Sequence, residues 1–170
     1  MDINFTPDEP TESELHVPFI EDARADTAPF YSTSKTEKQA RAEIEKNLAL
    51  LGAAVSRFQS GKFNVNGQER YGYLIGFLWH GASGEIRIAG LPMRKHSEAK
   101  ERQVRVQALL NVSQWLQTLI TQQIFSPGSN PLVPYLLAAD GKTVLEHIMS
   151  STLLRLEAPR HDVIDAEVDS

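Results

Sequence analysis

Arg70-Tyr-Gly-Tyr-Leu-Ile-Gly-Phe-Leu-Trp-His80 is the stretch that decides the fold of this chain. Large apolar residues fill its odd positions, and Leu74 and Leu78 lie among the even ones. Such alternation indicates a β-strand, because successive side chains of a strand point to opposite faces of the sheet. Since both faces carry apolar residues, we expect a central strand that other elements cover.

Further strands flank this stretch. Residues 53–58 predict a first strand, which residues 63–65 either extend or follow as a short second strand. Asn66-Gly67 favours a type I′ hairpin, because both central residues of that turn need positive φ. Residues 81–84 predict the next turn, and residues 85–91 alternate again before Pro92. We therefore expect an antiparallel meander of three or four strands.

A helix pattern precedes the meander. Ser34-Lys-Thr-Glu37 has the form of a capping box, in which the serine hydroxyl and the glutamate satisfy free amides at a helix start. Apolar residues then recur at positions 40, 44, 48 and 51. Gly52 fits the left-handed position that follows a helix. The first helix is therefore predicted between residues 34 and 52.

Two helix patterns follow the meander. Ser97 predicts the N-cap of a long helix that reaches about Gln123, and Thr143 predicts the cap of a short last helix from Val144. The apolar positions of the long helix extend well beyond one side, so either the sheet and other helices or a second subunit cover it. The fold class is α+β: a helix, the meander, a long buried helix and a short C-terminal helix. A homodimer is one expected form.

Charge divides the chain of 170 residues into three parts, although its net charge is −5. Residues 1–33 carry eight acids and one base, and residues 157–170 carry five acids and one base. Residues 34–156 hold fifteen Lys or Arg and nine Asp or Glu, a net charge of +6. We expect one α+β domain at 34–156 between two disordered acidic tails.

The acidic tails have several interpretations. Two short apolar clusters, residues 17–20 and 28–31, could dock on a partner or on the basic face of the protein itself. An acidic segment can also compete with nucleic acid for a basic domain or recruit a basic partner. The alternative is that the tails only increase solubility.

A cluster of basic residues is the first candidate site. It comprises Arg87, Arg94, Lys95, His96, Lys100, Arg102 and Arg105. These positions fall on a strand, the following loop and the first turns of the long helix, where charge and free helix amides can meet phosphates. Because Glu98 and Glu101 lie within the cluster, the alternative is a solvated face with local ion pairs.

An aromatic row is the second candidate. Tyr71 and Tyr73 begin the central strand and are expected to be its most accessible aromatic residues, able to stack on bases. The alternative is a row that faces the core, which large residues in alternation favour. Gly72 and Gly76, on the other face, indicate the close approach of a helix or a flat surface for a ligand.

Motifs for catalysis, metals and cofactors are absent from the sequence. The five histidines lack metal-ligand spacing, and no nucleophile or phosphate-loop motif occurs. The absence of cysteine excludes disulfides and thiolate chemistry and is typical of a reducing cytoplasm. No apolar run is long enough for a membrane span, and no signal-peptide pattern is present. We expect a soluble protein with no enzymatic activity, cofactor, metal or membrane partner.

Four stretches of this pattern resemble a family of uncharacterised proteins encoded by bacteriophages and prophages. They are the helix at 34–52, the end of the meander at 86–92, Arg102-Gln to Leu110, and Asp140-Gly-Lys-Thr-Val144. Val104, Val106 and Asn111 depart from the family pattern. The resemblance implies a helix, antiparallel sheet, helix order and a setting in the host cell cytoplasm. It implies no established activity.

Charge and resemblance together predict a non-enzymatic phage accessory protein that binds nucleic acid. Single-stranded DNA is the expected ligand, during replication or recombination. Tyr71 or Tyr73 is expected to stack on bases. The residues expected to hold phosphates are Arg87, Arg94, Lys95, Lys100, Arg102 and Arg105. The alternative is a module that binds a host or phage protein and inhibits or redirects a host factor, through the acidic N-terminus or the broad apolar helix. A structural homo-oligomer is a third possibility.

Overall fold

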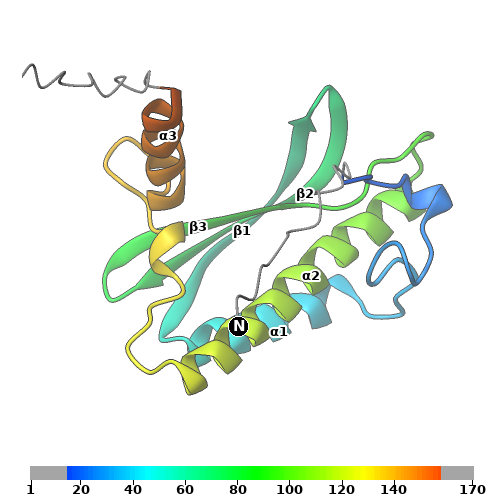
Figure 1. The fold of residues 1–170 in the computed structure, drawn as a ribbon. Coiled ribbons are helices and arrows are strands. Elements are labelled where there is room, and N and C mark those ends of the chain that lie inside the picture. The colour runs from blue at the N-terminus through cyan, green and yellow to red at the C-terminus, as the bar shows by residue number, and fades with distance from the viewer. Residues whose placement is uncertain (1–14, 158–170) are drawn as a thin grey trace, which may run out of the picture.

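The computed structural model describes the backbone of residues 15–157 and the side chains of residues 15–151. Its elements, shown in Figure 1, are η1 (Ile20–Asp22), α1 (Glu37–Leu50), β1 (Ala53–Val65), β2 (Gln68–Trp79), β3 (Ala82–Ala89), α2 (Glu98–Phe125), η2 (Val133–Tyr135) and α3 (Val144–Glu157). The predicted α+β class and the predicted order of helices and strands are confirmed.

The sheet has three antiparallel strands in the order β1-β2-β3. Residues 53–65 form one strand, with an irregularity between Val55 and Arg57, so that of the two alternatives for residues 63–65 the extension is found and the separate short strand is not. Asn66 and Gly67 have φ of 51° and 80°, as the type I′ hairpin requires. The predicted central strand is β2, which pairs with both neighbours.

The second hairpin turns earlier than predicted. His80 and Gly81 have φ of 47° and 81°, and β3 begins at Ala82, so the predicted turn at 81–84 is wrong. Positive φ is uncommon outside glycine, although histidine adopts it more readily than most residues. The two glycines at positions 81 and 84 suggested a four-residue turn. The turn consists of His80 and Gly81 only, and Gly84 lies within β3.

The first helix begins two residues later than the predicted cap. Thr36, and not Ser34, is the N-cap of α1, and its hydroxyl accepts the Gln39 backbone N–H. The Gln39 side chain accepts the Thr36 backbone N–H at 2.8 Å, which completes a capping box. Glutamine serves as well as glutamate in this role, so the sequence held two overlapping boxes. Gly52, with φ of 80°, ends the helix as predicted.

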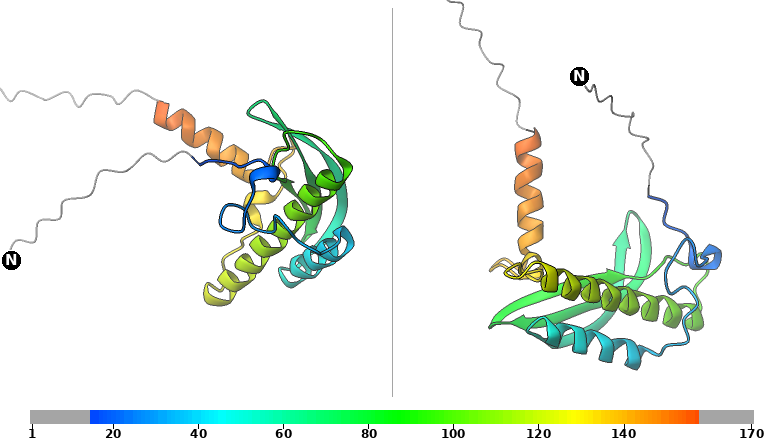
Figure 2. Two further views of the ribbon diagram at one scale, coloured as in Figure 1. Left: turned by 90° about the vertical axis from the view of Figure 1, so that its right-hand side faces the viewer. Right: turned by 60° about the horizontal axis from the view of Figure 1, so that its bottom comes forward.

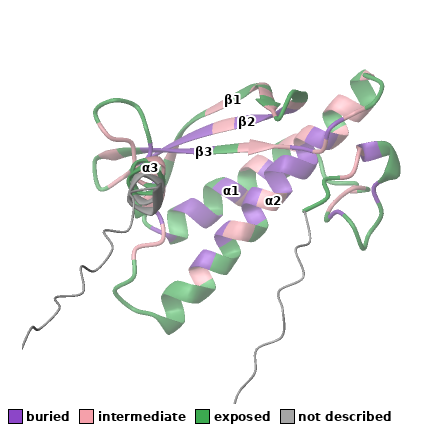
Figure 3. Cartoon of the chain, turned by 45° about the horizontal axis from the view of Figure 1, so that its top comes forward, coloured by how far each residue is buried: buried purple, intermediate pink, exposed green. Residues whose placement is uncertain are grey.

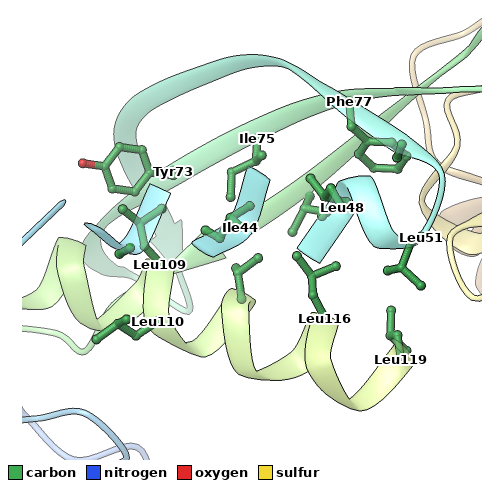
Figure 4. Close-up of a cluster of buried hydrophobic side chains, with 14 of the residues drawn as sticks. Ile44, Leu48, Leu51, Tyr73, Ile75, Phe77, Leu109, Leu110, Leu116 and Leu119 are labelled. Atoms are coloured by element: carbon green, nitrogen blue, oxygen red, sulfur yellow. The ribbon is translucent and has the colours of Figure 1, made fainter. Parts of the chain in front are cut away.

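Helices α1 and α2 lie side by side and cover one face of the sheet (Figures 1 and 2). The core between the layers draws Ile44 and Leu48 from α1, Ile75 and Phe77 from β2, and Leu116 from α2, all with no exposed surface (Figure 4). Buried positions accordingly follow the inner sides of these elements in Figure 3. Removal of this apolar surface from water is the main stabilising contribution to the fold.

Helix α2 is buried on more than one side, as its broad apolar surface predicts. Its buried residues contact α1, the sheet and the N-terminal segment. The Asn47 amide donates to the Ser113 carbonyl oxygen at 3.1 Å, so a buried polar group between the two helices is satisfied. Elements of the same chain thus cover most of α2, and homodimerisation stays a prediction.

Gly72 marks a close approach of two strands, where a helix or a flat surface was expected. A Cβ atom at this position would lie 1.9 Å from the Ile88 carbonyl oxygen of β3. The close approach to a helix occurs instead at Gly90, where a Cβ atom would lie 2.2 Å from the Val104 carbonyl oxygen of α2. Gly90 therefore lets the loop after β3 pass against α2.

Residues 15–33, which composition assigns to a disordered tail, lie against α2 and the loop after β3 (Figure 2). The Ile20 backbone N–H donates to the Pro92 carbonyl oxygen at 2.9 Å. The Gln107 side chain donates to the Pro29 carbonyl oxygen at 3.0 Å. Both apolar clusters of this segment thus dock on the protein itself. The remaining parts of the two predicted tails, residues 1–14 and 158–170, lie outside the described residues.

Helix α3 extends away from the two layers (Figures 1 and 2). Thr143 caps it as predicted, since its hydroxyl accepts the Glu146 backbone N–H and the Glu146 carboxylate accepts the Thr143 backbone N–H. Leu145, Ile148 and Met149 are exposed. Within the described residues, no helix has the length and apolar character needed to cross a membrane.

Candidate functional site

The loop between β3 and α2 forms an anion cradle, which we define as the backbone N–H groups of Arg94 and Lys95 with the side chains of Arg94 and Lys100. Ser97 caps α2, and its hydroxyl accepts the Lys100 backbone N–H. This cap starts the helix directly after the loop, so that the Lys100 side chain, in the first turn, turns back over it. The Lys100 ammonium also donates to the Lys95 carbonyl oxygen at 3.3 Å.

Two carboxylates of the same chain occupy the cradle. The Glu21 carboxylate accepts the backbone N–H groups of Arg94 at 3.3 Å and Lys95 at 3.4 Å, and the Lys100 ammonium at 2.7 Å. The Asp22 carboxylate accepts two hydrogen bonds from the Arg94 guanidinium. Successive backbone N–H groups beside cations are a recurrent anion-binding arrangement in proteins. The loop is thus built to bind oxyanions.

The charges of the cradle act on its own ligands. The hydrogen bond from Lys100, with those from the backbone, lowers the pKa of Glu21 to about 2. The hydrogen bonds to Asp22 raise the pKa of the Arg94 guanidinium. Lys100 thus favours the charged form of Glu21, and Asp22 favours the charged form of Arg94. The Glu21 carboxyl is therefore ionised throughout the neutral range.

An apolar anchor places these carboxylates. Ile20 is buried in a cluster with Tyr71 and Val104, and the Phe19 ring lies under the Arg94 guanidinium at 4.8 Å from its centroid. Cation–π contacts of this kind add a modest attraction. Docking of residues 17–20 on the basic face was one expected possibility, whereas sequence reasoning missed Glu21 and Asp22 as parts of the site. The only signal was an apolar cluster directly followed by two acids.

Arg87, predicted with the cluster, belongs to a separate network on the uncovered face of the sheet. Its guanidinium contacts Glu85 at 2.7 Å and Glu146 of α3 at 3.0 Å. Arg57 contacts the same Glu85, which is only 6% exposed, at 2.8 Å. These contacts raise the pKa of Arg87, first through Glu85. The network joins three elements and satisfies a buried carboxylate, so we assign it a structural role.

Arg105 and His96 both contact Glu101, and the Arg105 contact is one of the local ion pairs that were the alternative for this cluster. Arg105 donates to the Gly72 carbonyl oxygen at 2.9 Å and contacts Glu101 at 3.0 Å, with 14% of its side chain exposed. The His96 ring lies 2.8 Å from the same Glu101 carboxylate. These contacts lower the pKa of Glu101. Arg105 thus fastens α2 to the sheet and is not directed to a ligand.

Lys95, in the cradle loop, and Arg102, early in α2, are exposed cations. Among the described residues, neither side chain has an ion-pair partner. The Arg102 guanidinium contacts the Glu98 carbonyl oxygen and lines a hollow of about 470 Å³ between the first turns of α1 and α2, together with Lys35. The basic groups of this region are therefore Lys95, Arg102 and those of the cradle, which Glu21 and Asp22 occupy.

The two tyrosines are buried, and the prediction that they stay accessible for base stacking is wrong. Tyr71 is 8% exposed and Tyr73 is 1% exposed. Cations cover the Tyr71 ring, with Lys62 at 5.0 Å and Arg105 at 5.3 Å from its centroid. Burial raises the pKa of Tyr73 to about 12. The core-facing alternative for this row therefore holds.

Metal ligands do not gather in the described part of the chain, where no three His, Asp or Glu side chains are placed to share a metal ion. Comparison of the chain with protein-family models, with curated proteins and with solved structures finds no match.

Proposed function

We propose that this protein is a non-enzymatic accessory protein that binds nucleic acid through the cradle, Lys95 and Arg102. The observation that carries the proposal is the oxyanion geometry of the cradle, in which two backbone donors and the Lys100 ammonium hold one carboxylate and the Arg94 guanidinium holds the next. Phosphate groups are the oxyanions that nucleic acid presents in a row, and such contacts supply most of its non-specific affinity. A bacteriophage setting follows from the resemblance of the sequence.

Single-stranded DNA is the ligand that we propose. The cradle lies against η1 at the surface, and a flexible strand can adapt the positions of its phosphates to it, whereas a duplex holds them on a fixed helix. With Tyr71 and Tyr73 buried, the contacts are made to phosphates and not to bases. We therefore expect little dependence of affinity on base sequence.

A binding titration with single-stranded DNA, double-stranded DNA and RNA at low and high salt tests the proposal. The variant Lys95→Gln/Arg102→Gln removes two exposed cations and should weaken binding of single-stranded DNA by about tenfold at low salt, since each phosphate contact contributes to the salt-dependent affinity. The matched control, Lys38→Gln/Lys46→Gln, removes two exposed cations of α1 outside the cradle and should have a smaller effect. If the protein binds none of the three nucleic acids at low salt, the proposal is contradicted.

A protein-binding module is the second candidate, and the exposed side of α3 favours it. Ile148 and Met149 are more than half exposed, and Leu145 is 37% exposed, on a helix that extends from the body. Apolar residues gathered on one exposed helix commonly mark a binding surface. In this case Ile148→Glu/Met149→Glu should abolish binding of the partner without changing the unfolding temperature. Binding that persists in this variant would exclude α3 as the surface.

A further inference from the structure

We propose that Glu21 and Asp22 occupy the positions of two nucleic-acid phosphates, and that residues 19–22 leave the cradle when nucleic acid binds. These residues are then an internal competitor, and the cradle beneath them is the phosphate subsite. The inference rests on the proposed function, because it names the part of the surface that receives phosphates and the chain segment that blocks it.

The donors around Glu21 suit a phosphate as well as a carboxylate. Two backbone N–H groups and an ammonium converge on the Glu21 oxygens, and the Arg94 guanidinium presents two N–H groups to Asp22. A guanidinium binds carboxylate and phosphate in the same bidentate manner. Every group that now holds an acid of the chain can therefore hold a phosphate oxygen.

Simultaneous occupation is excluded by charge and by space. A phosphate placed at the cradle would meet the ionised Glu21, whose pKa of about 2 keeps it negative at neutral pH. Like charges at contact distance repel strongly where water is partly excluded. Nucleic acid and residues 19–22 must therefore exchange, and the cost of releasing this segment lowers the apparent affinity.

The segment can leave without unfolding the domain. Its attachment consists of the Ile20 side chain, the Ile20 backbone N–H bond to Pro92, the Phe19 ring against Arg94 and the two acids. The contacts of Pro29 and Tyr31 with Gln107 and Gln103 lie further along the chain and are independent of the cradle. These later contacts keep residues 19–22 close, so that the segment competes at high effective concentration.

The test uses the full chain and a fluorescein-labelled oligo(dT) of about 20 nucleotides, longer than the site of one small domain. Ile20→Ala removes the anchor without changing charge, and Glu21→Gln/Asp22→Asn removes the two competing acids. Both should bind the probe about three- to thirtyfold more tightly than the unmodified protein, the factor expected for two lost ion pairs or one lost apolar anchor. Asp26→Asn/Glu45→Gln removes the same charge elsewhere and should bind with a much smaller change.

The outcomes separate the two proposals. Equal affinities of the unmodified protein, Ile20→Ala and the acid variant would overturn the internal competitor while nucleic-acid binding stands. Absence of binding in every variant would overturn both proposals. An equal gain in the control and in the acid variant, with none in Ile20→Ala, would show general charge repulsion and also overturn the competitor.

Hydrogen exchange of the Ile20 amide supplies a second readout, which does not depend on any substitution. That amide is protected by its bond to the Pro92 carbonyl oxygen. If residues 19–22 leave, adding oligo(dT) to the unmodified protein should speed exchange at Ile20. If hydrogen exchange of the Ile20 amide slows or stays constant while the oligonucleotide is bound, residues 19–22 do not leave the cradle, which would contradict the proposal.

Discussion

Glu21 is the residue whose ionisation reports the cradle most directly. Its pKa in the folded protein is about 2, against an ordinary value of 4.5. A depressed pKa of the folded state means that docking of Glu21 is fully stabilising above about pH 4.5 and is lost as the pH falls through about 2. Titration of the Glu21 carboxyl by NMR should show this low midpoint, and Lys100→Gln should raise it. A midpoint near 4.5 in the unmodified protein would contradict the geometry.

Gly72 and Gly61 provide a second test at the residue scale, because they are cross-strand partners with different surroundings. A Cβ atom at Gly72 would lie 1.9 Å from the Ile88 carbonyl oxygen, whereas at Gly61 it would meet nothing within 4 Å. Gly72→Ala should therefore lower the free energy of unfolding by about 1–3 kcal/mol or more. Gly61→Ala should change it by less than about 0.5 kcal/mol. Urea denaturation measures both, and equal effects would show that β2 and β3 are not as close as described.

Single residues differ in how well the sequence alone predicts their roles. Some residues act only on neighbours in the sequence, so those neighbours suffice to assign their roles. They are the turn and helix-end residues Asn66, Gly67 and Gly52 and the helix caps Ser97 and Thr143. The partners of Lys100 could not be predicted, because Glu21 lies 79 residues away. The sequence shows that acidic and basic residues are separated along the chain. The fold is needed to show which acid forms an ion pair with which base.

Helix α3 is the element with the least support from the body, so its cap should matter. The Thr143 hydroxyl and the Glu146 carboxylate satisfy each other's backbone N–H groups. Thr143→Ala should weaken α3 by about 0.5–2 kcal/mol, the usual cost of losing an N-cap. Hydrogen exchange of the α3 amides measures this, with Thr118→Ala in the exposed part of α2 as the control. Unchanged exchange in α3 would mean that contacts other than the cap hold the helix.

The sequence predicted which segments form helices and which form strands better than it predicted the residues at which they begin and end. The broad apolar surface of α2 correctly indicated burial on several sides, yet the pattern could not show that residues 19–31 of the same chain form part of the cover. Because two capping boxes overlap in the sequence, the start of α1 was predicted two residues too early. The turn at His80 was missed because its φ of 47° is unusual for a residue other than glycine.

The whole molecule is held by the layer of side chains between the sheet and the two helices. Leu116 lies at the middle of this layer with no exposed surface, whereas Leu50 is 63% exposed. Leu116→Ala should lower the free energy of unfolding by about 2–5 kcal/mol through the cavity that it leaves. Leu50→Ala, the same substitution at the surface, should cost less than about 0.5 kcal/mol. Similar costs in urea denaturation would contradict the two-layer core.

The candidate site was predictable only in outline at this scale. Of the six basic positions expected to hold phosphates, Arg94, Lys95 and Lys100 belong to the cradle loop and the first turn of α2, and Arg102 lines the hollow between α1 and α2. Arg87 and Arg105 lie in structural ion pairs, because the strand and the helix direct them to buried acceptors. The tyrosines were misplaced, since alternation in a central strand cannot show which end the rest of the chain covers.

The salt dependence of oligo(dT) binding tests the central claim most directly. If phosphates bind at the cradle, Lys95 and Arg102, the logarithm of the affinity should fall linearly with the logarithm of the salt concentration. Three or four contacts predict a slope of about −2 to −3, from roughly −0.7 per phosphate of a single strand. Lys95→Gln/Arg102→Gln should make this slope shallower by about one unit or slightly more. A slope near zero, or no binding at about 50 mM salt, would contradict a phosphate-binding surface.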